Sequence, residues 1–86
     1  MKKVAFELEA FEQLGLWATQ DKKVFKKILE LIKDIQREPF SGIGKPEPLK
    51  YELQGYWSRR ISDEHRLIYK VEEDLLTILS CKYHYD

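Results

Sequence analysis

The 86-residue sequence has little cysteine and no long apolar run, and each shortage excludes a class of protein. Its one cysteine, Cys81, cannot form an intrachain disulfide and supplies no cysteine cluster for a metal, so a reducing cytosol is the natural setting. No apolar run approaches the roughly 20 residues that a membrane helix needs. Glu7, Glu9 and Glu12 interrupt any signal-peptide core. We therefore expect a cytoplasmic protein that uses no membrane.

The chain also lacks an excess of charge of either sign. Fifteen Lys and Arg residues balance fifteen Asp and Glu residues, so the formal net charge is zero. This balance argues against a strongly basic module that binds nucleic acid through bulk electrostatics. It allows a local basic patch, because residues 39–71 carry six Lys and Arg residues against four Asp and Glu residues.

At this length the chain supports one hydrophobic core, so a single domain over residues 1–86 is expected. Residues 4–6 form a short apolar run typical of an edge strand. Helical spacing then relates Ala10, Phe11, Leu14, Trp17 and Ala18. After a break at 19–21, a stronger stripe predicts a second helix: Val24, Phe25, Ile28, Leu29, Leu31, Ile32 and Ile35. Asp21 is the expected N-cap, and Pro39 ends this helix.

The second half is predicted to form three strands, at about residues 56–62, 66–71 and 75–83, with turns at 63–65 and 72–74. Three-residue loops would pair residues on the helix-covered face as follows: Ile61 with Leu67, Trp57 with Val71, Leu67 with Leu79, and Val71 with Leu75. The uncovered face would carry Arg60, Arg66, Ile68, Ile78 and Ser80. The result is an α+β fold, with two N-terminal helices packed on a twisted, mainly antiparallel sheet.

A proline-rich and glycine-rich loop at 39–48 contains the first candidate for chemistry. Glu47 stands between Pro46 and Pro48, which restrict the backbone and favour an extended conformation at Glu47. A carboxylate on a stiff segment suits a positioned catalytic group. The alternative is an ordinary solvated loop glutamate.

The arginines and histidines supply the other candidates. Arg59, Arg60 and Arg66 fall close together, and a guanidinium matches the geometry of phosphate oxygens. The alternative is that they are ordinary surface arginines paired with Asp63 or Glu64. His84 lies between two tyrosines and suits proton transfer, unless it is simply a terminal histidine. His65 is expected in a turn, either facing solvent or packed against the hairpin.

Together these groups meet the needs of metal-free RNA cleavage. A base removes the proton of the ribose 2′-OH, cations stabilise the charge that builds on phosphorus, and an acid protonates the leaving 5′-oxygen. The sequence has no Asp and Glu cluster of the kind that two-metal chemistry needs, and its histidines are poorly spaced for zinc. No cofactor or metal is therefore expected.

Four sequence blocks closely resemble the YoeB toxins, in the Txe/YoeB branch of the RelE-like toxins of type II toxin–antitoxin modules. The blocks are residues 44–50 (GKPEPLK), 55–61 (GYWSRRI), 64–69 (EHRLIY) and 83–85 (YHY). The resemblance covers nearly the whole chain. It implies a microbial ribonuclease-like fold and ribosome-dependent cleavage of mRNA in the decoding site, which inhibits translation.

The resemblance also implies roles for individual residues. Glu47 would be the general base, His84 the general acid and Arg66 the phosphate stabiliser. The accessory groups, which bind phosphate or stack on bases, would be Lys50, Arg60 and Tyr85. The implied partners are a YefM-like antitoxin, the ribosome with its mRNA, and a second copy in a homodimer. Operator DNA would be bound only through the antitoxin.

Two alternatives are non-enzymatic. The first is a non-catalytic relative of the same fold, such as a gyrase inhibitor, because fold alone does not determine function. The second is a module that only binds an antitoxin and represses their operon, for which exposed apolar positions Ile68 and Ile78 would form an interface.

Overall fold

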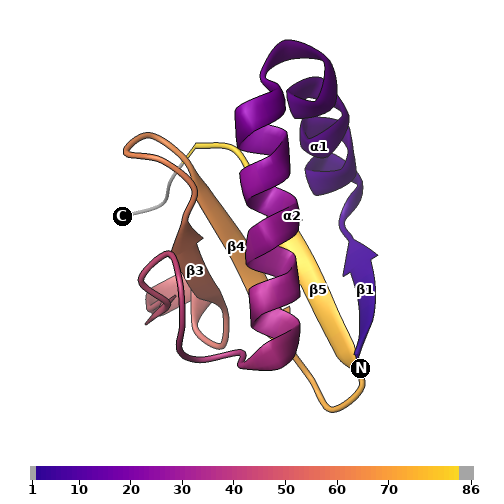
Figure 1. The fold of residues 1–86 in the computed structure, drawn as a ribbon. Helices are drawn as coiled ribbons and strands as arrows, with labels where there is room; N and C mark the ends of the chain where they lie inside the picture. Colours follow the sequence, from indigo (N-terminus) through magenta and orange to yellow (C-terminus); the bar gives the residue numbers. More distant parts are fainter. Residues whose placement is uncertain (1, 84–86) are drawn as a thin grey trace.

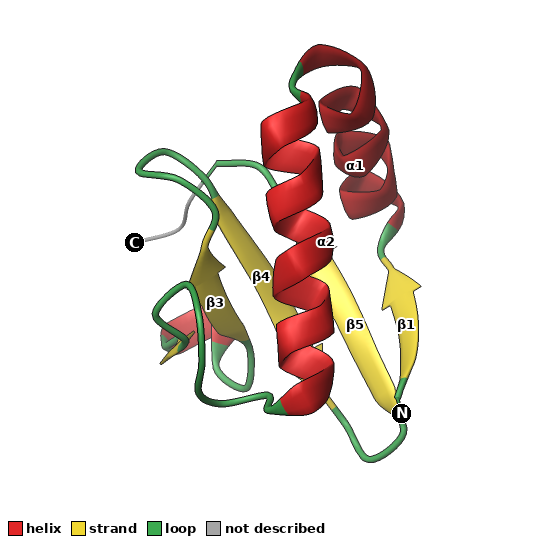
Figure 2. Ribbon diagram, viewed as in Figure 1, coloured by secondary structure: helices red, strands yellow, loops and turns green. Residues whose placement is uncertain are grey.

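The computed structural model describes residues 2–83, which form two helices and a five-stranded sheet (Figure 1). The elements in chain order are β1 (Lys3–Phe6), α1 (Leu8–Gln20), α2 (Lys22–Arg37), β2 (Glu47–Pro48), the 3₁₀ turn η1 (Tyr51–Leu53), β3 (Trp57–Arg60), β4 (Arg66–Val71) and β5 (Leu75–Ser80). Both helices lie on one face of the sheet (Figure 2). The predicted α+β fold is confirmed. No helix within residues 2–83 is long and apolar enough to cross a bilayer.

The second helix forms as its sequence predicts. The Asp21 side chain accepts hydrogen bonds from the backbone N–H groups of Lys23 and Val24, at 3.1 and 3.2 Å, and so caps α2. The helix ends at Arg37, two residues before Pro39. The apolar stripe buries three side chains fully against the sheet: Ile28, Leu31 and Ile35. Leu29, predicted in the same stripe, is 38% exposed.

The first helix is rotated relative to the prediction. Its buried side chains are Ala10, Gln13 and Trp17, whereas Phe11 is 62% exposed. The polar Gln13 is buried because its Oε1 accepts a hydrogen bond from the backbone N–H of Cys81, at 2.7 Å. A nonlocal hydrogen bond of this kind leaves no trace in the apolar periodicity, so the prediction placed Phe11 in the core wrongly.

The strands follow the order β1-β5-β4-β3-β2. The predicted edge strand at residues 4–6 is confirmed as part of β1, which pairs parallel with β5, while the other pairs are antiparallel. The core lies between the helices and the sheet face that carries Leu67, Tyr69, Leu76 and Ile78. The other face is covered by neither helix (Figure 2), and we call it the helix-free face.

The predicted register of the β3–β4 hairpin is wrong by two residues. Trp57 pairs with Tyr69, and Arg59 with Leu67. The turn spans residues 61–65, and the N–H groups of Ile61 and Ser62 both donate to the carbonyl of His65. Because the error is an even number of residues, each side chain keeps its predicted face.

The predicted register of the β4–β5 hairpin is wrong by one residue near the turn. Each β5 side chain there therefore lies on the opposite face of the sheet from the one predicted. Val71 pairs with Leu76, so Leu76 and Ile78 enter the core in place of Leu75 and Leu79. A bulge then follows, because Tyr69 pairs with Ile78 and Ile68 pairs with Ser80. The extra residue, Leu79, returns Ser80 to the helix-free face, as predicted for that residue.

Two predictions about Ile68 and Ile78 therefore fail. Ile78 faces the helices and not the uncovered face, because of the register change. Ile68 does share the face of its partner Ser58, but both isoleucines are 0% exposed. Neither side chain is available as an exposed interface residue.

Arg59 on β3 is fully buried and has no exposed surface. It forms an ion pair with Asp34 on α2, and its Nε donates to the Tyr69 hydroxyl at 3.2 Å. Its remaining hydrogen bonds go to three backbone carbonyls of the loop after α2, those of Glu38, Ser41 and Ile43, at 2.7, 2.9 and 3.1 Å. Neither alternative given for Arg59 holds, because it is not a surface arginine paired with Asp63 or Glu64 and its buried guanidinium is not open to a phosphate.

The groups around Arg59 bind the same loop. Asp34 accepts a hydrogen bond from the Ile43 N–H at 3.0 Å, and the Tyr69 hydroxyl donates to the carbonyl of Pro39 at 2.7 Å. The hydrogen bond from Arg59, with further ones from Ile43 and Arg37, lowers the pKa of Asp34 to about 2 despite its partial burial. Burial raises the pKa of Tyr69, so its hydroxyl remains a donor. The loop from 38 to 43 is thus fixed to the core.

Replacing Arg59 tests this arrangement. Arg59→Ala should lower the free energy of unfolding by about 3–5 kcal/mol, because it leaves a carboxylate and several buried acceptors without a donor. Urea denaturation measures the loss. Arg37→Ala is the matched control, since Arg37 also pairs with Asp34 but its side chain is 65% exposed, and it should cost less than about 1 kcal/mol. Equal losses in the two variants would contradict a central role for Arg59.

Acid should weaken the same contacts. The pKa of Asp34 falls from 3.8 to about 2 on folding, so the charged carboxylate favours the folded state above pH 3.8. That contribution should disappear as the pH falls from about 4 to about 2. Denaturation midpoints across this range, in the wild type and in Asp34→Asn, provide the measurement. The variant should be less stable at neutral pH, and its stability should depend less on pH between about 4 and about 2. The same pH dependence in both proteins would contradict the lowered pKa of Asp34.

Candidate active site

The sheet register brings three of the predicted site residues onto the helix-free face. One cross-strand row runs through Glu47, Ser58, Ile68 and Ser80, each paired with the next. Arg60 pairs with Arg66, two residues along β3 and β4 from that row. Directly paired residues in neighbouring strands project from the same face. Glu47, Arg60 and Arg66 therefore share the helix-free face. Arg59, which precedes Arg60 on β3, points to the core.

Glu47 and Arg60 are diagonal neighbours, because Arg60 lies two residues from the partner of Glu47 on β3. Such neighbours have α-carbons about 7–8 Å apart, within reach of long side chains. Both side chains are exposed. Neither arginine of the helix-free face forms an ion pair with Asp63 or Glu64 within residues 2–83. A carboxylate and cationic groups are thus available to one ligand.

The backbone around Glu47 is held on both sides. The extended conformation predicted for Glu47 is confirmed, because it forms β2 with Pro48. Before it, the carbonyl of Gly44 accepts a hydrogen bond from the Arg60 N–H at 2.6 Å. After it, the Leu49 N–H donates to the carbonyl of Tyr56 at 2.9 Å. The carboxylate consequently projects from a strand edge and not from a free loop.

Gly44 is required for this approach of the loop to the sheet. Its φ is +80°, in the left-handed region that favours glycine. An added Cβ would lie 2.9 Å from a methyl group of Leu31 and 3.1 Å from the carbonyl oxygen of Arg60. The lack of a side chain at Gly44 therefore lets the segment that leads to Glu47 lie against α2 and β3.

Arg66 is partly buried and anchored at the hairpin turn. Its Nη1 donates to the carbonyls of Ser62, Asp63 and His65, at 2.6, 3.3 and 3.1 Å. Within residues 2–83, Nε and Nη2 have no hydrogen-bond partner, so one edge of the guanidinium can bind an anion while the other fixes its position. The Arg66 N–H also donates to the carbonyl of Tyr83 at 2.8 Å.

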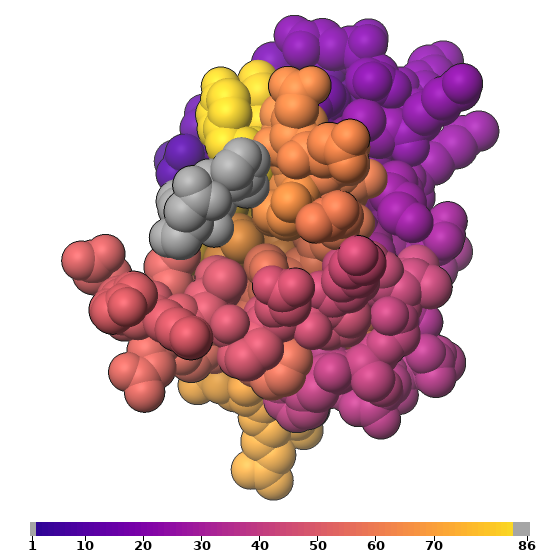
Figure 3. All heavy atoms as spheres, turned by 90° about the vertical axis from the view of Figure 1, so that its left-hand side faces the viewer, coloured from indigo at the N-terminus to yellow at the C-terminus, as the bar shows by residue number. Residues whose placement is uncertain are grey.

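The remaining predicted residues fall into two groups. Lys50 is exposed at the start of η1, in the segment between β2 and β3 that projects from the surface in Figure 3. Tyr51, next to it, is 85% exposed, and sequence reasoning did not single it out. His84 and Tyr85 lie outside the described residues.

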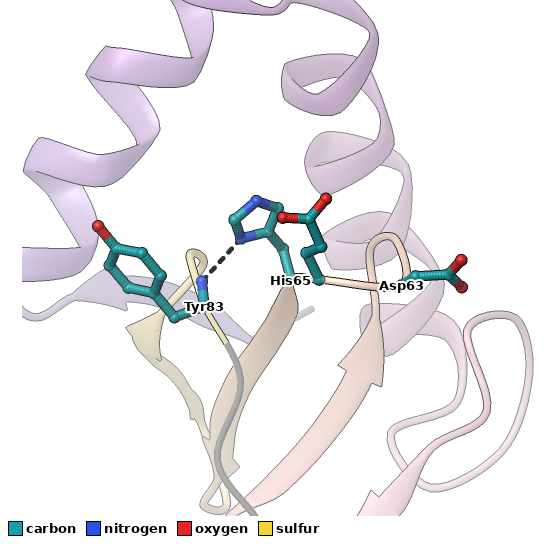
Figure 4. Close-up of a pocket in the computed structure, with 4 residues that line it drawn as sticks. Asp63, His65 and Tyr83 are labelled. Atoms are coloured by element: carbon teal, nitrogen blue, oxygen red, sulfur yellow. Dashed lines mark hydrogen bonds between the residues drawn. The ribbon is translucent and has the colours of Figure 1, made fainter.

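A shallow pocket of about 360 Å³ lies at the turn that precedes β4, lined by Asp63, Glu64, His65 and Tyr83 (Figure 4). His65 is neither a free turn residue nor packed only on its own hairpin. Its ring meets Trp17 of α1 edge to face, with centroids 4.9 Å apart, and its Nδ1 accepts a hydrogen bond from the Tyr83 N–H. Sequence reasoning missed this contact, which joins three distant segments.

Other chemistry finds little support in the described part of the chain. Residues 2–83 contain no group of three or more His, Cys, Asp or Glu side chains placed to hold a metal ion. Cys81 is buried, and burial raises the pKa of its thiol to about 12, so it is not a thiolate nucleophile at neutral pH.

The fold belongs to a class of small bacterial toxins. The structure of a YoeB/ParE toxin from Agrobacterium tumefaciens superimposes with a TM-score of 0.95 at 41% identity, over 99% of this chain and 100% of that one. The YoeB dimer from Staphylococcus aureus gives 0.93 at 50% identity, over 98% of each chain. A heterotetrameric YoeB–YefM toxin–antitoxin complex from the same species gives 0.91 at 50% identity, over 99% of each chain.

The family follows from the sequence comparisons. Residues 6–85 match the family of YoeB-like toxins of bacterial type II toxin–antitoxin systems. Toxin RelK of Mycobacterium tuberculosis is 54% identical over 99% of this chain and 100% of its own length. Toxin YoeB of Escherichia coli is 53% identical over 96% of this chain and 99% of its own length. The chain belongs to the YoeB-like toxin family, the toxin component of these systems.

Gly44 and Gly15 provide a matched test of how the Glu47 segment is held. Gly44→Ala should destabilise the protein by about 1–3 kcal/mol, because it combines a strained φ with a steric contact. Gly15→Ala should stabilise α1 by about 0.5–1 kcal/mol, since nothing lies within 4 Å of the added methyl group. Thermal and urea denaturation measure both changes. Destabilisation by both substitutions, or by neither, would contradict the close approach at Gly44.

Proposed function

We propose that this toxin is a ribosome-dependent, metal-independent endoribonuclease that cleaves mRNA in the decoding site and thereby inhibits translation. The observation that carries the proposal is the shared face of Glu47, Arg60 and Arg66. It combines a proton acceptor with phosphate-binding cations on one rigid surface. The resemblance of the sequence blocks to YoeB toxins gives these groups their roles.

In the proposed reaction, Glu47 accepts the proton of the ribose 2′-OH, and the 2′-oxygen attacks the adjacent phosphorus. The P–O5′ bond then breaks, which leaves a 2′,3′-cyclic phosphate and a 5′-hydroxyl. Arg66 stabilises the negative charge on the phosphoryl oxygens, and its turn contacts hold the guanidinium in place. His84 donates a proton to the leaving 5′-oxygen.

Position and exposure support the accessory roles of Arg60 and Lys50, and the resemblance to YoeB toxins supplies the role of Tyr85. Arg60, opposite Arg66, adds a second positive charge beside the phosphate. Lys50, on the projecting segment after β2, contacts a neighbouring phosphate, and Tyr85 stacks on a base. These groups bind substrate and take no part in proton transfer.

Dependence on the ribosome fits the overall electrostatics. A formal net charge of zero gives little nonspecific attraction to free RNA. An enzyme of 86 residues also has little surface with which to hold a message unaided. The ribosome would present the mRNA in the decoding site and so supply the binding that the toxin lacks.

The partners of the relatives suggest those of this chain. The S. aureus structures contain a YoeB dimer and a YoeB–YefM complex, at about 50% identity to this sequence. We extend both to this protein, as a homodimer and as a complex with a YefM-like antitoxin. The toxin would contact operator DNA only through the antitoxin. We place the protein in the cytoplasm. The alternative of a module that only binds an antitoxin loses the interface proposed for it, because Ile68 and Ile78 are buried.

Cleavage of a defined message on purified ribosomes tests the proposal. Glu47→Ala and His84→Gln should each reduce the cleavage rate by about 10²- to 10⁴-fold, the usual contribution of a general base or acid. Glu52→Gln is the matched control, because Glu52 is an exposed acid on the neighbouring η1, and it should cleave like the wild type.

Two outcomes would contradict the proposal in different ways. Unchanged cleavage in both Glu47→Ala and His84→Gln would show that the assigned roles are wrong. A wild-type protein that arrests growth but cuts no mRNA, with or without ribosomes, would exclude the endoribonuclease function. Inhibition of gyrase supercoiling by that protein would then favour the non-catalytic alternative.

A further inference from the structure

The turn between β3 and β4 is tied to the end of the described chain through a histidine. His65 Nδ1 lies 2.8 Å from the backbone nitrogen of Tyr83, which donates its proton (Figure 4). The edge-to-face contact with Trp17 holds the imidazole ring itself in place. An acceptor at Nδ1 requires the neutral ring with its proton on Nε2, because an imidazolium donates from both nitrogens.

The chain that leads to Tyr83 is held at both of its preceding residues. Both backbone groups of Cys81 bond to α1: the N–H to Gln13 at 2.7 Å, and the carbonyl to the Trp17 indole at 2.9 Å. The Lys82 ammonium lies 5.7 Å from the Trp17 ring and 5.2 Å from the Tyr83 ring. The path out of β5 is therefore fixed before it reaches the turn.

Tyr83 itself adopts an unfavourable backbone conformation. Its φ is +66°, in the left-handed region that a tyrosine rarely occupies. Such a conformation persists only when its surroundings impose it. Here the N–H is bound by His65 and the carbonyl by the Arg66 N–H at 2.8 Å, so both backbone groups of Tyr83 are held by consecutive residues of the turn.

We infer that His65 is a positioning residue for the reaction, which acts by fixing the backbone of Tyr83. This inference rests on the proposed function, in which Arg66 and His84 both contact the reacting phosphate. Consecutive α-carbons are 3.8 Å apart, so a fixed Tyr83 restricts where His84 can lie relative to Arg66. An error of about 1 Å in such a placement can reduce a rate by about 100-fold.

Two substitutions separate the acceptor of His65 from its ring. His65→Phe keeps a ring against Trp17 but has no acceptor, whereas His65→Asn keeps an acceptor oxygen on Cγ, where Nδ1 was, and loses the ring. In the ribosome cleavage assay, His65→Phe should lower kcat by about 10- to 100-fold with little change in KM. His65→Asn should recover most of that loss. Denaturation midpoints of both variants check that they are folded.

The opposite order of activities would overturn the inference. If His65→Phe cleaves like the wild type and His65→Asn is impaired, the ring packing matters and the hydrogen bond does not. A parallel increase in KM and fall in kcat in both variants would likewise indicate a merely structural role.

Amide hydrogen exchange distinguishes this inference from the proposed function. The Tyr83 N–H should be protected in the wild type and in His65→Asn, and should lose protection in His65→Phe. An unprotected Tyr83 amide in the wild type would overturn the tether, even if Glu47→Ala abolishes cleavage as expected. Protection without any wild-type cleavage of mRNA would instead overturn the function, and with it the reaction that His65 is inferred to serve.

Discussion

The rest of the structure depends on one buried charge. Arg59 has no exposed surface, so its guanidinium must be fully paired within the fold. Only an arrangement that brings α2, β4 and the loop after α2 together supplies Asp34, the Tyr69 hydroxyl and three backbone carbonyls at once. These contacts fix the conformation of the loop from 38 to 43, although the loop has little regular backbone hydrogen bonding of its own.

That constraint is transmitted to the helix-free face. The loop fixed by Arg59 continues through Gly44, whose carbonyl is bound by the N–H of Arg60, into the strand that carries Glu47. Arg59 and Arg60 thus project from opposite faces at consecutive positions: Arg59 holds the loop after α2, and Arg60 lies on the helix-free face. The turn that precedes β4 holds the Arg66 guanidinium through the Ser62 carbonyl, and the Arg66 N–H binds the carbonyl of Tyr83. The sheet pairing of Arg60 with Arg66 joins the two halves.

Sequence reasoning succeeded where the signals are local. The Asp21 cap, the end of α2 before Pro39, the bounds of β4 and the extended backbone at Glu47 all depend on neighbouring residues. It failed where the deciding contact is distant. The pattern Leu75-Leu76-Thr77-Ile78-Leu79 offers apolar side chains to either face, so the register in which β5 pairs with β4 decides which of them enter the core. Gln13 enters the core through its hydrogen bond to Cys81, which no periodicity of α1 encodes.

The sequence by itself determined the family and the candidate chemistry, because the motif blocks keep their order and spacing along the chain. It also determined that Arg59 and Arg60 project from opposite faces, since alternation is a local property of a strand. Only the tertiary structure decided that Arg59 is fully buried and which groups it binds. A strand pattern assigns a side chain to a face but not to its partners; these depend on Asp34 and Tyr69, which the fold brings to one face of β3 from 25 residues before Arg59 and 10 residues after it.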